Sequence, residues 1–337
     1  MFTIGLTDHL EGPSGRPSSE IFAEVAELVR LADELGAEYA WFAEHHGHAH
    51  LGHLPTPLLF ALHLAGQTRR IRLGTAIICL NLHHPLDVAE QVAVADALTG
   101  GRIAAGFGSG STPEESDLFK AGIGLGGGAD ERDRHSRFEE ALRVIAAAWG
   151  GDWDQGVGGV PAHTTLPAAG SGLIGRSWQA VNSVGSARIA GSFGFNVLFS
   201  HLRTPEQYRE YVDAYRASGG RGKVAANRPV FVGPDDATAF ETAEPALRTI
   251  WRRFRDEGKI PGETPEPDRP QDLCGHPINF IVGGPQSVAR QLIDLHRAVP
   301  YDVANVEVRW AGLTHEQVRE SLRRLLVEVV PLVRAAR

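Results

Sequence analysis

The chain has 337 residues, of which 42% are hydrophobic and 22% charged, so it can bury the core of one large barrel or of two ordinary domains. Its formal net charge is −8 and it has no long basic run, which argues against nucleic acid or an acidic membrane surface as a partner. No apolar stretch of about 20 residues and no signal peptide are visible, and the two cysteines, Cys79 and Cys274, lack metal-site spacing, so a cytoplasmic setting is expected.

A repeated unit organises the chain: a short apolar run is followed by a polar loop and then by a segment of helical period. Strands are predicted at residues 2–6, 39–43, 71–78, 102–107, 177–181, 196–199, 224–232 and 303–308. Helices are predicted at residues 18–35, 57–67, 85–98, 136–149, 186–193, 205–217, 236–254, 285–296 and 314–333, and a further apolar run at 278–282 leads into the helix at 285. This repetition predicts an α/β fold, a (β/α)8 TIM barrel with insertions; an open doubly wound sheet is the alternative.

We expect this barrel to form a single domain over residues 1–337 with three excursions from the regular pattern. They lie near residues 108–130, 150–176 and 233–277. The second is rich in glycine and proline, and the third ends in a proline-rich loop, which are compositions typical of irregular structure. Because binding residues of such barrels lie on loops, the loops after strands one, four and seven are expected to select the substrate.

A polar cluster, Glu44-His45-His46, ends the apolar run at 39–43 abruptly. In α/β barrels the C-terminal ends of the strands carry the catalytic residues. An imidazole has an ordinary pKa near neutrality, so His45 is our candidate for donating or accepting a proton there. A hydrogen-bonded histidine that only shapes the pocket is the alternative, and Glu44 is interpreted as a buried hydrogen-bond partner.

Three further histidines, His48, His50 and His53, follow within eight residues of His45. Imidazole is a common metal ligand, so a metal site is one interpretation. However, the spacing matches no standard zinc pattern, and neither aspartate nor cysteine lies in this segment. We therefore predict no metal and interpret these histidines as a loop at a polar substrate entrance.

Several segments, taken in order, carry a family resemblance. They are Glu44-His45-His46, RIRLGTAIICLNLHHP at 70–85, Ala89-Glu90, LTGGRIAAGFGSG at 98–110, SWQAVNSVGSARIAGSFGF at 177–195, and Gly283-Gly284-Pro285 with Val288. Together they resemble the bacterial luciferase-like flavin-dependent monooxygenases over most of the chain. Each motif alone is weak, and their order and spacing make the combination specific.

The resemblance implies a barrel with insertions that binds reduced FMN (FMNH2) and forms a homodimer. The implied reaction is that of a two-component monooxygenase, in which a separate flavin reductase supplies FMNH2 and O2 oxygenates a small organic substrate through a flavin C4a-peroxide. A sister branch uses the deazaflavin F420 for hydride transfer, and this is one alternative; a non-catalytic flavin-binding protein of the same fold is another. The F420 branch tends to carry Asp-His where this chain has Glu44-His45-His46, which favours FMN.

Small residues at the end of the third strand are implied to contact the flavin ring. The family places the backbone of Thr75, Ala76 and Ile77 against the isoalloxazine, and the peptide bond matching Ala76-Ile77 can be cis. A layer of small packing residues is the alternative interpretation of the same segment.

Residues around the fifth helix are implied to bind the FMN phosphate. Asn182, Ser183 and Ser186 precede or begin that helix, where backbone N–H groups and short hydroxyls form an anion site. Ordinary N-capping by Ser183 or Ser186 uses the same donors and is the alternative. Arg137 matches an arginine that the family uses on the phosphate from helix four.

Two positions depart from the luciferase pattern. Ser109 stands where the family has an arginine, which would pair with phosphate through two hydrogen bonds. His201 follows the sixth strand, at the place where luciferase has a tryptophan over the flavin ring, so we count His201 among the cofactor-binding residues. The departure at His201 argues against light emission as the function.

Overall fold

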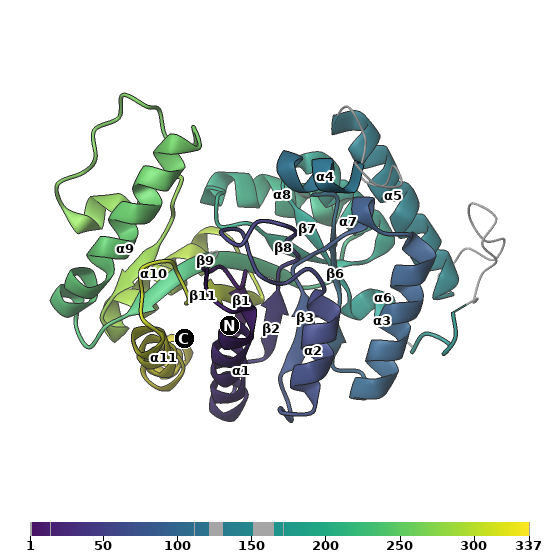
Figure 1. Ribbon diagram of the computed structural model, residues 1–337, viewed down its shortest axis with the longest axis horizontal. Helices are drawn as coiled ribbons and strands as arrows, with labels where there is room; N and C mark the ends of the chain where they lie inside the picture. The colour runs from purple at the N-terminus through teal and green to yellow at the C-terminus, as the bar shows by residue number, and fades with distance from the viewer. Residues whose placement is uncertain are drawn as a thin grey trace.

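The computed structural model of the protein describes residues 2–13, 15–110, 112–120, 131–150, 165–170 and 172–336. Its centre is a curled sheet of parallel strands surrounded by helices (Figure 1). The strands of this sheet are β1 (Thr3–Asp8), β2 (Tyr39–Phe42), β3 (Arg72–Thr75), β4 (Ile78–Cys79), β5 (Ile103–Ala104), β6 (Gly106–Gly108), β7 (Trp178–Val181), β8 (Asn196–Phe199), β9 (Val224–Val232) and β11 (Val303–Glu307).

The curled sheet closes on itself. Its order is β4-β6-β7-β8-β9-β11-β1-β2-β3-β5, and all neighbours pair in parallel. Ala76 and Ile77 separate β3 from β4, and Ala105 separates β5 from β6, so each of these pairs is one interrupted strand. Because β3 pairs with β5 and β4 pairs with β6, the two ends of the order meet. Eight strand positions therefore close a barrel, and the predicted (β/α)8 fold is confirmed.

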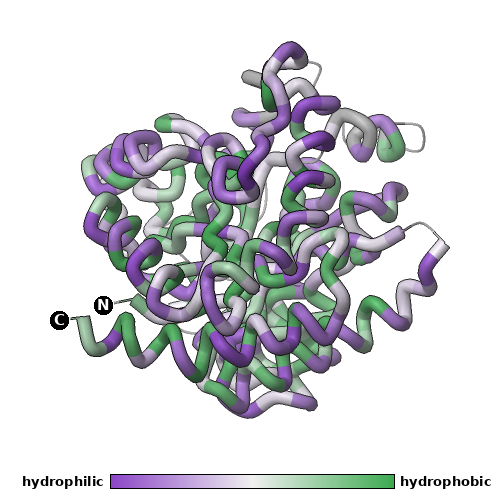
Figure 2. The backbone as a smooth tube through the Cα atoms, turned by 90° about the vertical axis from the view of Figure 1, so that its left-hand side faces the viewer, coloured by the Kyte–Doolittle hydropathy of each residue, from purple (hydrophilic) through white to green (hydrophobic). Residues whose placement is uncertain are grey.

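An outer layer of helices covers the ring (Figure 1). It consists of α1 (Ser18–Leu35), α2 (Pro57–Ala65), α3 (Pro85–Thr99), α5 (Glu131–Ala148), α7 (Val184–Phe193), α8 (Pro205–Ala217), α10 (Pro285–Ala298), α11 (His315–Arg324) and α12 (Val330–Ala335). In Figure 2 the inner strands are mostly hydrophobic, while the outer helices alternate between hydrophobic and hydrophilic segments, as expected for helices that bury one face. Among the described residues, no helix combines the length and the apolar composition needed to cross a membrane.

Several boundaries differ from those predicted. The strands expected at 71–78 and 102–107 are each interrupted, and the closing helix expected at 314–333 contains a π-helical turn, Leu325–Val329, between α11 and α12. Short helices α4 (Pro113–Lys120), α6 (Leu173–Arg176) and the 3-10 turn Leu80–Leu82 were not predicted. These features change hydrogen bonding locally without changing the period of apolar residues, so the sequence pattern does not reveal them.

The third excursion forms a small layer outside the ring. It contains α9 (Asp236–Asp256), which stands at the left edge of Figure 1, and the 3-10 turn Pro270–Cys274. The strand that follows it, β10 (Ile281–Gly283), pairs with β9 outside the barrel. Its own apolar cluster includes Phe254, Phe280 and Trp310. Residues 121–130 and 151–164 of the other two excursions lie outside the described residues, and the single-domain organisation stays a prediction.

Aromatic side chains fill the barrel near the N-terminal ends of the strands. Tyr39 and Trp41 of β2 stack at a centroid distance of 4.5 Å, and Trp178 of β7 meets Trp41 edge-on at 5.2 Å. All three side chains are buried. This plug places the open part of the barrel at the C-terminal ends of the strands.

Candidate active site

A cavity of about 400 Å³ lies among the C-terminal ends of the strands, the end that was predicted to carry the chemistry. Its lining consists of Thr7, Asp8, His9, Glu11, His45, Leu51, Ala76, Ile77, Ala180, Asn182, Leu198, Phe199, Ser200, His201, Leu202, Asn227, Ile250, Arg253, Phe254, Glu257, Lys259, Phe280, Asn305, Glu307, Arg309, Trp310 and Ala311. Of the predicted site residues, this lining contains His45, Ala76, Ile77, Asn182 and His201, but not Thr75, Arg137, Ser183 or Ser186.

His45 lies just after β2 and has a partner at each ring nitrogen. Its Nδ1 lies 3.1 Å from Glu115 Oε1, and its Nε2 lies 3.1 Å from His9 Nδ1. Because a carboxylate only accepts hydrogen bonds, Nδ1 of His45 carries a proton. Burial alone would raise the pKa of Glu115, but the hydrogen bond from His45 and the amides of Thr112 and His46 lower it to about 2. Glu115 is therefore an anion that fixes the orientation of the His45 ring.

Glu307, the last residue of β11, is the second carboxylate of the cavity. Its Oε1 lies 3.5 Å from His9 Nε2 and 3.5 Å from His201 Nδ1, and it accepts a hydrogen bond of 2.5 Å from Asn227 Nδ2. Burial would raise its pKa, but the charges and hydrogen bonds of His201 and His9 hold the pKa of Glu307 well below its ordinary value. His201, which was expected to contact the flavin ring, thus lies in the cavity next to an anion.

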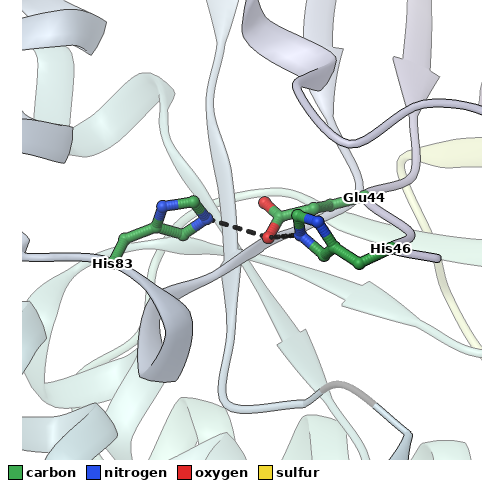
Figure 3. A group of neighbouring side chains, drawn as sticks. All are labelled: Glu44, His46 and His83. Carbon is green, nitrogen blue, oxygen red and sulfur yellow. Dashed lines mark hydrogen bonds and ion pairs between the residues drawn. The ribbon is translucent and has the colours of Figure 1, made fainter. Parts of the chain in front are cut away.

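A separate cluster joins the buried Glu44 with two partly buried histidines, His46 and His83 (Figure 3). Both imidazole Nε2 atoms approach the same oxygen, Glu44 Oε1, at 3.0 Å from His46 and 2.8 Å from His83, and the Cys79 amide donates to Glu44 Oε2. Burial would lower the pKa of His83, but the hydrogen bond to Glu44 raises it. The residue types suit a metal, but here the two ring nitrogens donate protons to the carboxylate instead of offering lone pairs. The expected absence of a metal stays a prediction.

The three histidines of the entrance loop have other neighbours. His48 and His50 meet edge-on at a centroid distance of 5.7 Å, and His53 Nδ1 lies 2.9 Å from Ser18 Oγ. Among the described residues, the group whose ligand atoms converge within 4.8 Å is Glu44, His46 and His83, none of which belongs to this loop triplet.

The segment between β3 and β4 forms one wall of the cavity. Its Ala76-Ile77 peptide bond is cis, the conformation that the family resemblance allowed. Thr75 is fully buried beneath this wall, and its hydroxyl donates to the Gly106 carbonyl and accepts from the Gly106 amide, both at 2.8 Å. Thr75 therefore supports the wall from behind, while Ala76 and Ile77 face the cavity.

The N-terminus of α7 is organised by a capping box. Ser183 Oγ accepts from the Ser186 amide, and Ser186 Oγ accepts in turn from the Ser183 amide. The capping interpretation is therefore confirmed, although the amides of Val184 and Gly185 make no hydrogen bond among the described residues. These two amides remain available to an anion.

Arg137 projects from α5, which packs near α7. Arg143, six residues further along α5, lies over the ring of Phe193 at the C-terminal end of α7. At 1.5 Å of helix rise per residue, Arg137 lies about 9 Å before Arg143 along the axis of α5. Ser109 directly follows β6, and its carbonyl accepts a hydrogen bond from Asn81.

Polar residues of the site that the sequence analysis missed include His9, Glu115, Asn227 and Glu307. His9 and Glu307 carried a usable signal, because each is a polar residue near the C-terminal end of a predicted strand. Glu115 lies on α4, a helix that was not predicted, so nothing in the sequence pointed to its contact with His45.

A closed ring of eight parallel strands with a polar cavity at its C-terminal end defines a (β/α)8-barrel enzyme. The family model of the luciferase-like monooxygenases matches residues 2–301. The chain therefore belongs to the luciferase-like monooxygenase family, which confirms the resemblance and the predicted class of enzyme, a flavin-dependent monooxygenase.

Two relatives and one solved structure illustrate the similarity. The chain is 35% identical over 248 residues to 4-hydroxyprotoasukamycin monooxygenase of Streptomyces nodosus subsp. asukaensis, covering 68% of this chain and 63% of that protein. It is 24% identical over 345 residues to the oxygenase component of the flavin-dependent trigonelline monooxygenase of Acinetobacter baylyi, covering 96% and 93%. Monooxygenase RslO1 from Streptomyces bottropensis has the same fold, with a TM-score of 0.81 at 23% identity over 98% of this chain and 99% of that one.

Proposed function

We propose that this protein is the oxygenase component of a two-component monooxygenase, which uses FMNH2 and O2 to oxygenate a small organic substrate. The observation that carries the proposal is that His45 and the Ala76–Ile77 wall line the same cavity at the C-terminal end of the barrel. Membership of the family supports it, as does a relative whose name describes an oxygenase component.

The cavity suits a flat ring system such as the isoalloxazine of FMN. Ala76, Ile77 and Ala180 line it, and Gly108 lies so close to Ile77 that a Cβ there would come within 2.5 Å of Ile77 Cδ1. A larger residue at position 108 would push Ile77 out of its place in the wall. The small residues Gly108 of β6 and Ala180 of β7 thus leave a smooth apolar surface beside Ala76 and Ile77, against which a planar ring can lie.

The phosphate of FMN would be held at the N-terminus of α7. The amides of Val184 and Gly185 point out of the helix end, the capping hydroxyl of Ser183 lies beside them, and Asn182 lines the cavity next to this end. Arg137 would add a positive charge from α5. This arrangement compensates in part for Ser109, which offers no charge where the family has an arginine.

When it is bound, reduced FMN supplies the electrons that activate O2. The chain itself binds and orients the flavin, excludes water with the apolar part of the lining, and holds a proton at His45. Asn227 and Glu307 offer polar contacts on the side of the cavity that faces β9 and β11. The separate reductase, the homodimer and the cytoplasmic setting stay predictions.

The test is an anaerobic titration of the purified protein with three reduced cofactors: FMN, riboflavin and F420. We expect FMNH2 to bind tightest and reduced riboflavin at least about tenfold more weakly, because riboflavin lacks the phosphate that α7 would hold. Tighter binding of F420 would favour the hydride-transfer alternative. Equal affinity for FMNH2 and reduced riboflavin would show that the N-terminus of α7 does not bind the phosphate.

A second step separates an enzyme from a non-catalytic flavin protein. The FMNH2 complex is mixed with ¹⁸O2 and a panel of aromatic and aliphatic substrates, and products are analysed by mass spectrometry. A product that contains one ¹⁸O atom supports the proposal. Binding of FMNH2 with no ¹⁸O in any product across the panel would favour the non-catalytic alternative.

A further inference from the structure

Two imidazole rings stand in a row between two carboxylates of the cavity. Glu115 Oε1 lies 3.1 Å from His45 Nδ1, His45 Nε2 lies 3.1 Å from His9 Nδ1, and His9 Nε2 lies 3.5 Å from Glu307 Oε1. The two rings meet edge to edge through these nitrogens, with centroids 5.4 Å apart and planes inclined by 30°. Both carboxylates are well buried: the side chains of Glu115 and Glu307 are 2% and 12% exposed.

The number of protons in this row follows from the chemistry of its ends. An ionised carboxylate only accepts, so His45 Nδ1 carries a proton toward Glu115, and His9 Nε2 carries one toward Glu307 when these two side chains form their 3.5 Å ion pair. The contact between the two rings needs a third proton, because two facing lone pairs would repel each other. Two neutral imidazoles carry one ring proton each, so the third proton gives the pair one positive charge.

We propose that His9 and His45 share this proton, and that His9 acts through His45 as the proton reservoir of the active site. When the proton moves, the Nδ1–H bond of His9 breaks, an Nε2–H bond of His45 forms, and the positive charge passes from one ring to the other. Neither ring has to turn, and both outer protons stay on their carboxylate contacts. His9 is thus a positioning residue, and its catalytic part rests on the proposed function.

The charges around His9 favour a proton held there at neutral pH. Those that face it are Asp8 and Glu11 from its own strand and loop, Glu307 and Arg309 from the end of β11, His201 from the loop after β8, and Arg253 from α9. Arg309 pairs with Asp8, and Arg253 lies 3.5 Å from Glu11, so Glu307 is the anion left for His9. Burial alone would lower the pKa of His9, but the hydrogen bond and charge of Glu307 raise it to about 9.

The sharing of the proton changes what His45 can do. With both ring nitrogens occupied, His45 alone has neither a free proton nor a free lone pair to offer. When His9 holds the proton, Nε2 of His45 keeps its lone pair and can accept a proton if the contact between the rings opens. When the proton sits on His45, the same atom can donate it. His9 therefore sets the protonation state of His45 through the contact between their rings.

The direct test is nuclear magnetic resonance of the flavin-free protein labelled with ¹⁵N-histidine. We expect a scalar coupling between ring nitrogens of two different histidines, because an N–H···N hydrogen bond transmits it. We also expect the His9 signals to move as the pH rises through about 9, and the signals of the hydrogen-bonded ring to follow that single transition. Both measurements use the unaltered chain, so they do not depend on a variant that folds. Two rings without coupling that titrate independently would overturn the proposal.

His9→Gln assigns the pair and provides a second readout. It is expected to shift the His45 signals at neutral pH, whereas His63→Gln, which replaces an exposed histidine on α2, leaves them unchanged. In turnover, His9→Gln should lower kcat about tenfold to a hundredfold and move its pH profile, with the affinity for FMNH2 kept within about twofold. If the pH profile of kcat is the same for His9→Gln and the unaltered protein, His9 has no part in catalysis. If the unaltered protein oxygenates nothing, the proposed function fails while the resonance experiment still decides whether the proton is shared.

Discussion

Thr75→Val tests whether one hydroxyl joins the two interrupted strands behind the cavity wall. Thr75 ends β3, and its fully buried hydroxyl bonds both the amide and the carbonyl of Gly106, the first residue of β6, at 2.8 Å each. Regular backbone pairing between the two interrupted strands occurs on either side of this contact: β3 pairs with β5 before it, and β4 pairs with β6 after it. The hydroxyl thus replaces backbone pairing at the interruption.

The magnitude follows from what the substitution leaves behind. Valine has nearly the same shape as threonine, so packing is kept, but a buried N–H and a buried C=O lose their partner. Each unpaired buried group costs about 1–3 kcal/mol, so the free energy of unfolding should fall by about 2–6 kcal/mol. The matched control is Thr99→Val in α3: Thr99 is also buried, but its hydroxyl donates to the Ala95 carbonyl within a helix, so about 1 kcal/mol or less is expected.

The assay is urea unfolding followed by circular dichroism for the unaltered protein, Thr75→Val, Thr75→Ser and Thr99→Val. Serine keeps the hydroxyl and loses one methyl group, so it should cost only about 1 kcal/mol. If valine at position 75 destabilises no more than valine at position 99, the bridging role is wrong. If serine at position 75 costs as much as valine, the packing of the methyl group, and not the hydroxyl, explains the loss.

Three further predictions concern the site and its support. Arg137→Ala should weaken FMNH2 binding at least about fivefold without changing riboflavin binding, while Arg143→Ala on the same helix should change neither; an equal loss for both flavins would place Arg137 away from the phosphate. The pKa of Glu115 is lowered to about 2, so the stability that this carboxylate contributes is present above its ordinary pKa and is lost as the pH falls from about 4.5 to about 2. Urea titrations at several pH values should show that Glu115→Gln abolishes this part of the acid sensitivity. If the free energy of unfolding depends on pH in the same way for the variant and the unaltered protein, the prediction is contradicted. Asp33→Asn should lower the urea midpoint of unfolding. The two carboxylate oxygens of Asp33 accept hydrogen bonds from the backbone N–H groups of residues 69, 70 and 71, and asparagine keeps only one of these two acceptor oxygens. An unchanged midpoint would show that water replaces the lost acceptor.

The sequence by itself determined an α/β fold built on a parallel sheet, whereas closure into a barrel rather than an open doubly wound sheet came from the structure. Short apolar runs with helices between them require parallel strands, because only a buried parallel sheet makes both faces of a strand apolar. The same pattern placed Glu44-His45-His46 at a strand end and therefore at the face that carries chemistry. The capping role of Ser183 and Ser186 could also be predicted from the sequence, because a capping box is a local motif of four residues.

Interruptions of the strands were beyond the reach of the sequence. The pattern of apolar residues at 71–78 continues across Ala76 and Ile77, although the pairing stops there. Whether a residue pairs with the neighbouring strand depends on the partner's backbone, and Thr75 shows how a side chain can take over when it does not.

Only the tertiary structure decided which polar groups meet. His45 contacts His9, 36 positions earlier, and Glu115, 70 positions later, while Glu307 reaches His9 from the far end of the barrel's last strand. The closing of the ring places β11 beside β1, and the hydrogen bonds of Glu115 with His45 and His46 hold α4 beside the end of β2. Local preferences fix the order of strands and helices, but the protonation of His45 depends on carboxylates whose positions come from the ring closure and from a helix that leaves no periodic signal.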